Sequence, residues 1–580
     1  MHRFRVWAPE RQRVELVAEG RRLAMAPADR GWWEVSDDAA LAGTRFGYSL
    51  DGGEVRPDPR SGSQPDGVLG LSEVVDHGAH TWCDTAWEGM KLDGAVLYEL
   101  HTGTFTPQGT FDGIVDHLPH LVALGVDAIE LMPVAEFSGD RGWGYDGVDL
   151  FAPHHVYGGP AGLKRLVDAC HGSGLGVVID VVYNHLGPEG NFLSEFGPYF
   201  SDRHQTDWGA GFNFDGHAGD EVRRFVLDNA LMWLRDYHVD GLRLDAVHAI
   251  ADEAPLHILE QLATEVDALG SELRRVTFVI AESDLNDPRF VRSHEADGYG
   301  LDAAWSDDWH HALHAALTGE RTGYYEDFGS LEILSKVLRQ AWAYDGEWSA
   351  HRQKIRGGSI AGLPAHSFVI ALQNHDQVGN RATGDRLGAL VDESVLKAAA
   401  ALLLTAPFTP MLFQGEEWAA SSPFQYFTDH ADRGLGQAVT EGRRREFARF
   451  GWDPDRVPDP QDTRTFARSK LRWAELDKPF HRRMLEWYRQ LIKLRRRLPA
   501  PRGSSGEGVR VDVDAQARTV KFERGSIIVN VNLGERDWAL TISDGDRLLM
   551  ASEPAIKAHD GSLRMPPSSV VILERMTAVD

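Results

Sequence analysis

Gly241-Leu242-Arg243-Leu244-Asp245-Ala246-Val247-His248 is a short apolar run that ends in charged and polar side chains. Such runs are typical of strands in a parallel sheet, which is buried on both faces. Three other apolar runs end in the same way, in Asp180-Val181-Val182-Tyr183-Asn184-His185, in Ile280-Ala281-Glu282-Ser283 and in Gln373-Asn374-His375-Asp376-Gln377. The polar residues follow their strands, so we expect them to gather at the carboxyl edge of one sheet.

Eight strand-like runs alternate with helix-like segments such as residues 222–237 and 256–269. The runs lie at residues 95–100, 128–133, 176–182, 241–246, 277–281, 302–305, 368–373 and 410–413. Eight β/α units over about 400 residues predict an α/β fold, a (β/α)8 TIM barrel with loop insertions. Function in such a barrel lies at the carboxyl ends of the strands.

The two ends of the chain have a different, alternating pattern that is typical of short antiparallel strands. Residues 1–90 predict a small N-terminal β-sandwich followed by a linker. Residues 91–498 are the predicted barrel, and residues 499–580 predict a C-terminal β-sandwich domain.

The 580 residues carry 60 Lys and Arg against 87 Asp and Glu, a formal net charge of −27. This acidic balance argues against nucleic-acid partners, which need a basic footprint, and against binding to an anionic membrane surface. The most basic helix, at residues 482–498, has a clear apolar face. We therefore interpret its charges as a solvated outer face.

The longest uncharged apolar run, residues 398–413, contains two prolines and is shorter than a membrane span. We expect a buried helix followed by a buried strand there. Residues 1–17 have no apolar segment of the signal-peptide type. Cys83 and Cys170 cannot form a disulfide framework, and we expect two buried free thiols in a cytoplasmic protein.

The acids at the strand ends suit glycoside hydrolysis. That reaction needs one ionised carboxylate and one carboxylic acid that protonates the leaving oxygen. Arg243 lies two residues before Asp245, on the same strand face, and can keep it ionised. Glu282 fits the acid, since burial and neighbouring negative charge raise the pKa of a carboxyl.

These four segments resemble the signature regions of glycoside hydrolase family 13, the α-amylase family. The resemblance implies that Asp245 is the nucleophile, Glu282 the general acid/base and Asp376 the transition-state stabiliser. It further implies retention of the anomeric configuration, for which the two reacting carboxyls lie about 5–5.5 Å apart. The implied lining of the sugar site comprises Tyr145, Asp180, His185, Arg243, His248, Asn374, His375, Gln377 and Asn380.

Residues 4–9, 305–314, 423–430 and 441–447 resemble segments of the maltooligosyltrehalose trehalohydrolases within that family. The resemblance implies hydrolysis of the α-1,4 bond next to the terminal trehalose of maltooligosyl trehalose, a substrate that a partner synthase makes. It also implies that the N-terminal sandwich resembles a carbohydrate-binding module. Calcium is common in the wider family, but the sequence has no EF-hand-type loop, and we expect no cofactor and no essential metal. We expect a wall around the leaving trehalose built from Asp307, Asp308, Trp309, His310, His311, Phe424, Tyr426 and Phe427.

Other interpretations compete with these. Residues 424–427 also fit a packed aromatic turn. His310 and His314 have zinc-ligand spacing, but the H-E-x-x-H motif is absent. Residues 142–147 match G-x-G-x-x-G, yet an irregular run rather than a helix is expected to follow. The rival activities are a glycogen-branching transglycosylase of the same family and an inactive glucan-binding protein.

Overall fold

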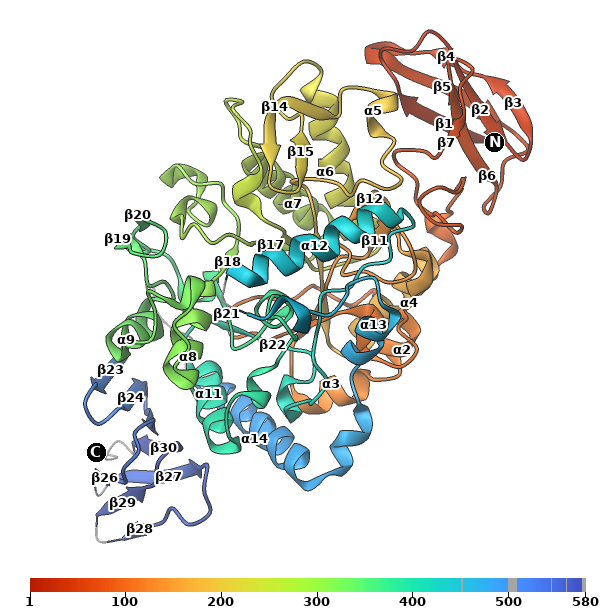
Figure 1. Cartoon of the computed structure of the whole chain (residues 1–580). Helices are drawn as coiled ribbons and strands as arrows, with labels where there is room; N and C mark the ends of the chain where they lie inside the picture. Colours follow the sequence, from red (N-terminus) through yellow and green to blue (C-terminus); the bar gives the residue numbers. More distant parts are fainter. Residues whose placement is uncertain (450–451, 499–507, 544, 560, 576–580) are drawn as a thin grey trace.

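The computed structural model describes residues 1–449, 452–498, 508–543, 545–559 and 561–575 (Figure 1). Eight parallel strands close into a barrel, which confirms the predicted TIM-barrel fold. In order around the barrel these are β9 (Leu97–Leu100), β10 (Ala128–Leu131), β13 (Gly176–Val181), β16 (Gly241–Leu244), β17 (Phe278–Ala281), β18 (Ala303–Trp305), β21 (Phe368–Ala371) and β22 (Thr409–Phe413).

The chain also forms helices, and those at residues 159–172, 258–273 and 307–318 pack their apolar stripes on β13, β17 and β21. The longest are α4 (Gly159–Gly172), α6 (Gly219–Asp236), α7 (Ile258–Leu273), α8 (Asp307–Thr318), α9 (Leu331–Gln340), α11 (Glu393–Thr405), α12 (Arg433–Arg449) and α14 (Pro479–Arg495). The shorter ones are α1 (Thr102–Phe105), α2 (Phe111–Val115), α3 (Leu118–Leu124), α5 (Leu193–Phe196), α10 (His375–Gly379) and α13 (Thr463–Ser469). The run predicted as a buried helix and strand is α11 and β22.

Strand register and side-chain alternation place several charged residues inside the barrel. Glu99 of β9 pairs in register with Glu130 of β10, and Asp180 of β13 pairs with Arg243 of β16. All four side chains are buried. They lie above an apolar layer that includes Leu97, Ala128 and Val178. The barrel interior is thus apolar at one end and ionic at the carboxyl end.

Two sheets form the N-terminal part of the chain. One contains β1 (His2–Trp7), β5 (Trp32–Asp37) and β4 (Ala26–Pro27). The other contains β3 (Arg21–Ala24), β2 (Val14–Ala18), β6 (Arg45–Leu50), β7 (Val55–Arg56) and β8 (Ser72–Glu73). The rings of Phe4 and Phe46 meet between the sheets, with centroids 4.8 Å apart. Arg60 joins this part to α6 through an ion pair with Asp228 at 2.7 Å.

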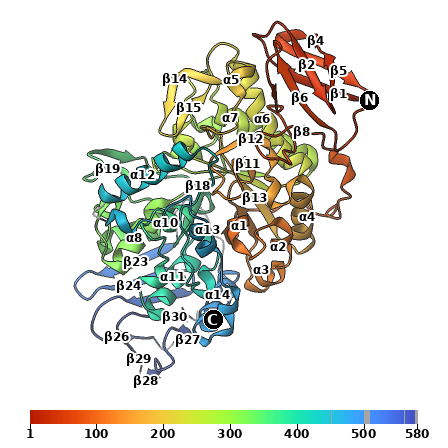
Figure 2. The ribbon, with the colours of Figure 1, turned by 45° about the vertical axis from the view of Figure 1, so that its right-hand side comes forward.

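Two further sheets form the C-terminal part, at the opposite end of the molecule (Figures 1 and 2). The larger contains β23 (Val509–Asp514), β24 (Thr519–Arg524), β25 (Ile527–Asn532), β30 (Ser569–Arg575) and β27 (Asp546–Ala551). The smaller contains β26 (Trp538–Thr541), β29 (Ser562–Met565) and β28 (Ala558–His559). We keep the domain boundaries at residues 90 and 498 as a proposal, because residues 499–507 lie outside the described residues.

Three smaller hairpins extend from the barrel loops. The first pairs β11 (Ala135–Phe137) with β12 (Gly147–Pro153), the second pairs β14 (Phe200–Thr206) with β15 (Gly209–Phe212), and the third pairs β19 (Asp345–Ser349) with β20 (Lys354–Gly357). The expectation of an irregular run after residue 147 was therefore wrong, since those residues form β12. A dinucleotide-type helix does not follow the glycines either.

Two other expectations need correction. Both cysteines are free and Cys170 is buried, but Cys83 is exposed. Arg495 of the basic helix α14 is not solvated: it is buried and donates to the backbone oxygens of Ala406 at 2.8 Å and Phe408 at 2.6 Å. Among the described residues, no helix combines the length and apolarity needed to cross a bilayer.

We predict that Arg495→Leu lowers the free energy of unfolding by about 3 kcal/mol, because buried carbonyls lose a charged donor. Arg497, just beyond the end of this helix, is half exposed and pairs with Glu574 at 2.7 Å, so Arg497→Leu should cost less than about 1 kcal/mol. Urea denaturation followed by tryptophan fluorescence measures both. Equal losses would contradict a buried anchoring role for Arg495.

Candidate active site

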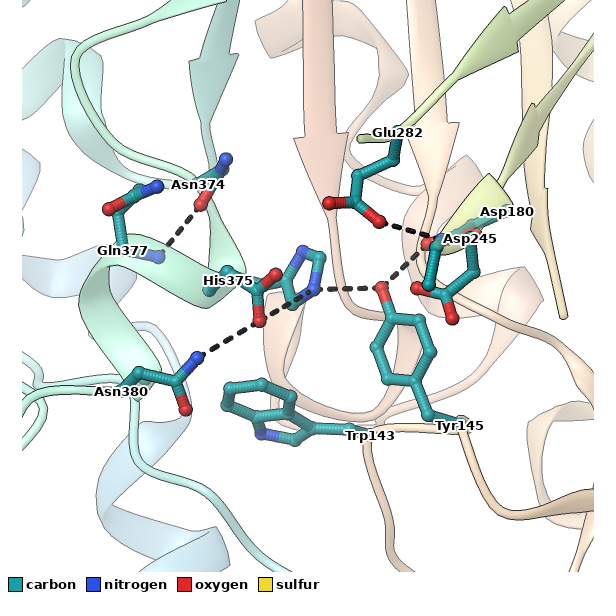
Figure 3. A network of polar contacts seen from close by, with 12 residues as sticks. Trp143, Tyr145, Asp180, Asp245, Glu282, Asn374, His375, Gln377 and Asn380 are labelled. Carbon is teal, nitrogen blue, oxygen red and sulfur yellow. Dashed lines mark hydrogen bonds and ion pairs between the residues drawn. The ribbon is translucent and has the colours of Figure 1, made fainter. Parts of the chain in front are cut away.

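The polar residues predicted at the strand ends do come together at the carboxyl end of the barrel (Figure 3). Asp180 lies in β13, Asp245 follows β16 and Glu282 follows β17. His375 and Asp376 begin helix α10 after β21. Because β13, β16 and β17 are adjacent, three of these carboxyls meet around one point.

That point is the guanidinium of Arg243, which is fully buried. Its Nη1 contacts both oxygens of Asp180 at 2.9 and 2.8 Å and Oδ1 of Asp245 at 2.9 Å. Its Nη2 lies 3.7 Å from Oε2 of Glu282. The guanidinium carbon sits 4.3 Å from the ring centre of Trp305, a cation–π contact. The guanidinium of Arg243 therefore contacts or lies close to the carboxyls of Asp180, Asp245 and Glu282.

Asp245 has a second partner that the predicted set did not include. Nδ2 of Asn184 donates both to Oδ2 and to the backbone oxygen of Asp245, each at 2.9 Å. The available signal was the position of Asn184 directly after strand β13, in the same polar segment as His185. Asn184 and Arg243 together fix both carboxylate oxygens of Asp245.

Glu282 is placed by the backbone beside Asp245. Ala246 adopts the left-handed region, with φ 40°, and its N–H donates to Oε2 of Glu282 at 2.7 Å. An alanine rarely adopts that conformation, so local strain is stored at this point. Burial, together with the charges of Asp245, Asp307 and Asp376, raises the pKa of Glu282 to about 8 against the opposing effect of Arg243. At neutral pH Glu282 therefore holds a proton.

A chain of hydrogen bonds leads through His375. Its Nδ1 lies 2.5 Å from Oε1 of Glu99, and its Nε2 lies 2.8 Å from the hydroxyl of Tyr145. That hydroxyl donates to Oδ2 of Asp180 at 2.6 Å (Figure 3). Burial alone would lower the pKa of His375, but the charges of Asp376 and Glu99 and the hydrogen bond to Glu99 raise it to about 9. Burial raises the pKa of Asp180 to about 7, although Arg243 opposes this.

Asp376 is the most open of the predicted acids, with 43% of its side chain exposed. Its Oδ1 accepts from Nδ2 of Asn380 at 3.1 Å. Oδ1 of Asn380 in turn accepts from Nη1 of Arg443 at 2.8 Å, and Nη2 of Arg443 donates to the oxygen of Gly379 at 2.9 Å. Arg443, which the prediction missed, thereby attaches helix α12 to the site. The half-buried ring of Tyr426 lies 4.7 Å from the guanidinium of Arg443.

Three predicted wall residues of helix α8, Asp307, Asp308 and His311, line one small cavity beside the acids, which Asp284 and Arg352 also line. Asp307 and His311 are one helical turn apart. Nε2 of Gln377 donates to Oδ1 of Asp307 at 3.1 Å. Burial and the charge of Asp376 raise the pKa of Asp307 to about 7.

Four predicted substrate-binding residues, Trp309, His310, Phe424 and Phe427, do not reach the site in this structure, and we correct their placement. Trp309 is fully buried in the main core. The ring nitrogens of His310 bind the oxygen of Leu372 and the hydroxyl of Tyr325, so they are not free for zinc or sugar. Phe424 and Phe427 pack in an apolar cluster with Trp143. The packed-turn interpretation therefore holds for these two phenylalanines. Asp308 does line the cavity, where its carboxylate accepts from Asn286 and from backbone N–H groups.

The remaining predicted residues have mixed placements. The side chain of Asn374 is used as a helix cap, since its Oδ1 accepts from the N–H of Gln377 at 2.8 Å. His248 is exposed after β16. His185 is buried, and its ring stacks against Trp208, with centroids 5.5 Å apart. Trp208, at the tip of the β14–β15 hairpin, is 53% exposed and was not predicted.

Two groups of side chains among the described residues have metal-binding geometry. They are Glu136 with His154 and His155, and His204 with Asp215 and Glu253. Neither group contains a residue of the predicted site. In the first group, Oε1 of Glu136 is already hydrogen-bonded to Nδ1 of His155, at 2.7 Å.

Comparison with known proteins identifies close relatives over the whole chain. The alpha-amylase catalytic-domain model matches residues 63–216. The malto-oligosyltrehalose trehalohydrolase of Rhizobium sp. (strain M-11) is 50% identical over 580 residues, 98% of this chain and 97% of that protein. The enzyme of the same name from Arthrobacter ramosus is 52% identical over 99% of this chain and all of its own length.

Two further matches are informative. A crystal structure from Salmonella typhimurium, described as an alpha amylase, superposes with a TM-score of 0.90 at 39% identity, covering 99% of this chain and 97% of its own. A 1,4-alpha-glucan branching enzyme of Pseudoalteromonas atlantica is 34% identical over 275 residues, which is only 42% of this chain and 38% of that protein.

We predict that Arg443→Ala increases backbone hydrogen exchange across α12, because this side chain makes the contacts to Asn380 and Gly379. Arg445 on the same helix is 69% exposed and has a 3.6 Å ion pair with Glu441 within the helix, so Arg445→Ala is the matched control. Mass spectrometry of peptides from Arg433–Arg449 measures the exchange. An equal change in both variants would refute the anchoring role of Arg443.

Proposed function

The chain belongs to the malto-oligosyltrehalose trehalohydrolase family, and on that premise we propose that it hydrolyses the α-1,4-glucosidic bond next to the terminal trehalose of maltooligosyl trehalose and releases trehalose. The observation that carries the proposal is the pairing of an ion-paired Asp245 with a buried, protonated Glu282 around Arg243. One acid is kept ionised and the other protonated, as glycoside hydrolysis requires.

In the proposed first step, Oδ of Asp245 attacks the anomeric carbon while Glu282 gives its proton to the oxygen of the leaving trehalose. The glycosidic C–O bond breaks as the Asp245–sugar ester bond forms. Glu282, now ionised, takes a proton from water, and that water hydrolyses the ester. Asp245 and protonated Glu282 are regenerated, and the sugar leaves with its anomeric configuration retained. This mechanism keeps the prediction of carboxyls about 5–5.5 Å apart.

The other predicted residues take binding roles in the proposal. Asp376 stabilises the positive charge that develops on the sugar ring, and Tyr145 supports that ring from below. Asp307, His311, Gln377 and Tyr426 are the proposed contacts on the trehalose side, because polar groups that pair with specific hydroxyls discriminate strongly between substrates. Trp208, exposed beside His185, suits the glucan side, where an aromatic face can cover a sugar ring.

The rival activity is glycogen branching, in which a glucan hydroxyl replaces water. The Rhizobium and Arthrobacter relatives, which match nearly the whole chain, carry the trehalohydrolase name, whereas the branching enzyme matches less than half of it. The Arg443 contacts also favour the hydrolase, because they involve the segment at 441–447 that resembles trehalohydrolases. The intact set of Asp245, Glu282 and Asp376 argues against an inactive binding protein.

The proposal extends to the enzyme that supplies the substrate and to the cellular compartment. The substrate requires a preceding enzyme that converts the reducing end of a maltodextrin into a trehalose unit, so we propose a functional coupling to such a synthase. The two free cysteines support the cytoplasm as the compartment, because free thiols suit a reducing environment.

We expect the protein to release free trehalose from maltooligosyl trehalose, and we expect Asp245→Ala to lower the rate at least 10³-fold while glucan binding persists. The loss follows because no ester can form without the carboxylate. Chromatography of the products measures trehalose, and calorimetry with the variant measures binding. New α-1,6 branches on amylose with no trehalose released would overturn the proposal.

We also predict that kcat/KM falls as pH rises through about 8. The pKa of Glu282 is raised to about 8, so the proton that the leaving group needs is present below that pH and lost above it. A maltosyl fluoride, whose leaving group needs no protonation, serves as the control and should lack this alkaline decline. A flat profile up to pH 10 with maltooligosyl trehalose would exclude Glu282 as the acid.

A further inference from the structure

Glu99 is a buried acid inside the barrel that the mechanism above does not use. It belongs to β9 and is 1% exposed. Its Oε1 lies 2.5 Å from Nδ1 of His375, and its Oε2 accepts the backbone N–H of the same residue at 2.9 Å. Both oxygens of one carboxylate thus hold one histidine, at its ring and at its main chain.

The hydrogen bonds around His375 decide how many protons its ring carries. Asp180 accepts from Arg243 at both oxygens, so it is the acceptor for the Tyr145 hydroxyl as well. The Tyr145 hydroxyl has one proton, and it donates that proton to Asp180. The hydroxyl oxygen must therefore accept a hydrogen bond from Nε2 of His375. Nδ1 faces a carboxylate oxygen of Glu99 and also needs a proton. Two protons on the ring make it an imidazolium.

We propose that Glu99 is a positioning residue that holds His375 as an imidazolium, with its Nε2–H donated to the hydroxyl of Tyr145 at the sugar site. The catalytic role of this pair rests on the proposed hydrolase function, whereas the hydrogen bonds between Glu99 and His375 do not depend on that function. The pair Glu99–His375 is neutral as a whole. It can therefore supply a strong charge-assisted donor without adding net positive charge where the sugar itself becomes positive.

The groups that face His375 agree with this assignment. Asp376 on α10 lies 3.5 Å from Nε2, and the site also contains Asp180, Arg243 and Tyr145. The neighbouring Glu130 of β10 is 1% exposed, and burial together with the charge of Glu99 raises its pKa well above the ordinary value. Glu130 is therefore neutral, and Glu99 is the carboxylate that balances the ring. The neighbouring His101 has a pKa lowered to about 3 by burial, so it adds no charge.

Glu99→Gln removes the charge but keeps the size and a hydrogen-bonding group. We expect kcat/KM at pH 7 to fall about 10–100-fold, with most of the loss in kcat. The alkaline decline should move to lower pH by about one unit or more, because an unaided histidine titrates near 6.5. Glu130→Gln replaces a neutral acid by a neutral amide in the adjacent strand, and it should leave both the rate and the pH profile unchanged.

The protonation state of His375 can also be measured directly by NMR spectroscopy, without substrate. In protein labelled with 13C-histidine, the His375 signal is the one absent from His375→Asn. We expect it to report an imidazolium at pH 7 and to titrate near 9 in the parent, and to be neutral at pH 7 in Glu99→Gln. A neutral His375 in the parent overturns the inference, even if Glu99→Gln does not fold. An imidazolium in a parent that releases no trehalose would refute the hydrolase function alone.

Discussion

The buried guanidinium of Arg243 is the interaction on which the rest of the site depends. It is surrounded by Asp180, Asp245 and Glu282, and by the ring of Trp305. A buried cation without anionic partners is costly, and so is each buried acid without a cation. Asp180, Asp245 and Arg243 therefore stabilise one another, and removal of Arg243 would leave the charges of the two aspartates uncompensated in the barrel. Closure of the barrel supplies this arrangement, because it brings β13, β16 and β17 side by side.

The same restraint explains why neighbouring carboxyls differ in protonation. Asp245 receives Arg243 and Asn184 on its two oxygens, whereas Glu282 has the guanidinium only at 3.7 Å and takes one backbone N–H. The better-paired acid stays ionised, and its charge then helps to keep the proton on its neighbour. The difference arises from strand register and from the left-handed turn at Ala246, and not from the residue types alone.

Much of this could be predicted from the sequence, because buried parallel strands are continuous apolar runs and their polar ends are easy to see. The α8 residues were harder. A family-like segment does not say which face of a helix looks into the site, and Trp309 and His310 turned out to lie on the core side. The spacing of Asp307 and His311, four residues apart, would have indicated one shared face. Phe424 and Phe427 lie in a loop without such a period, so only the packing could place them.

Glu99 illustrates a different limit. It lies in an apolar run, and a single acid in such a run does not indicate a functional site. Its partner His375 is 276 residues away in sequence. Its significance depends on the alternation that turns it into the barrel and on the register that sets it beside Glu130. A neutral sugar gains little from the overall charge of −27. The rate at this site depends instead on which buried groups carry protons, and a buried pair such as Glu99–His375 fixes one of those protons in place.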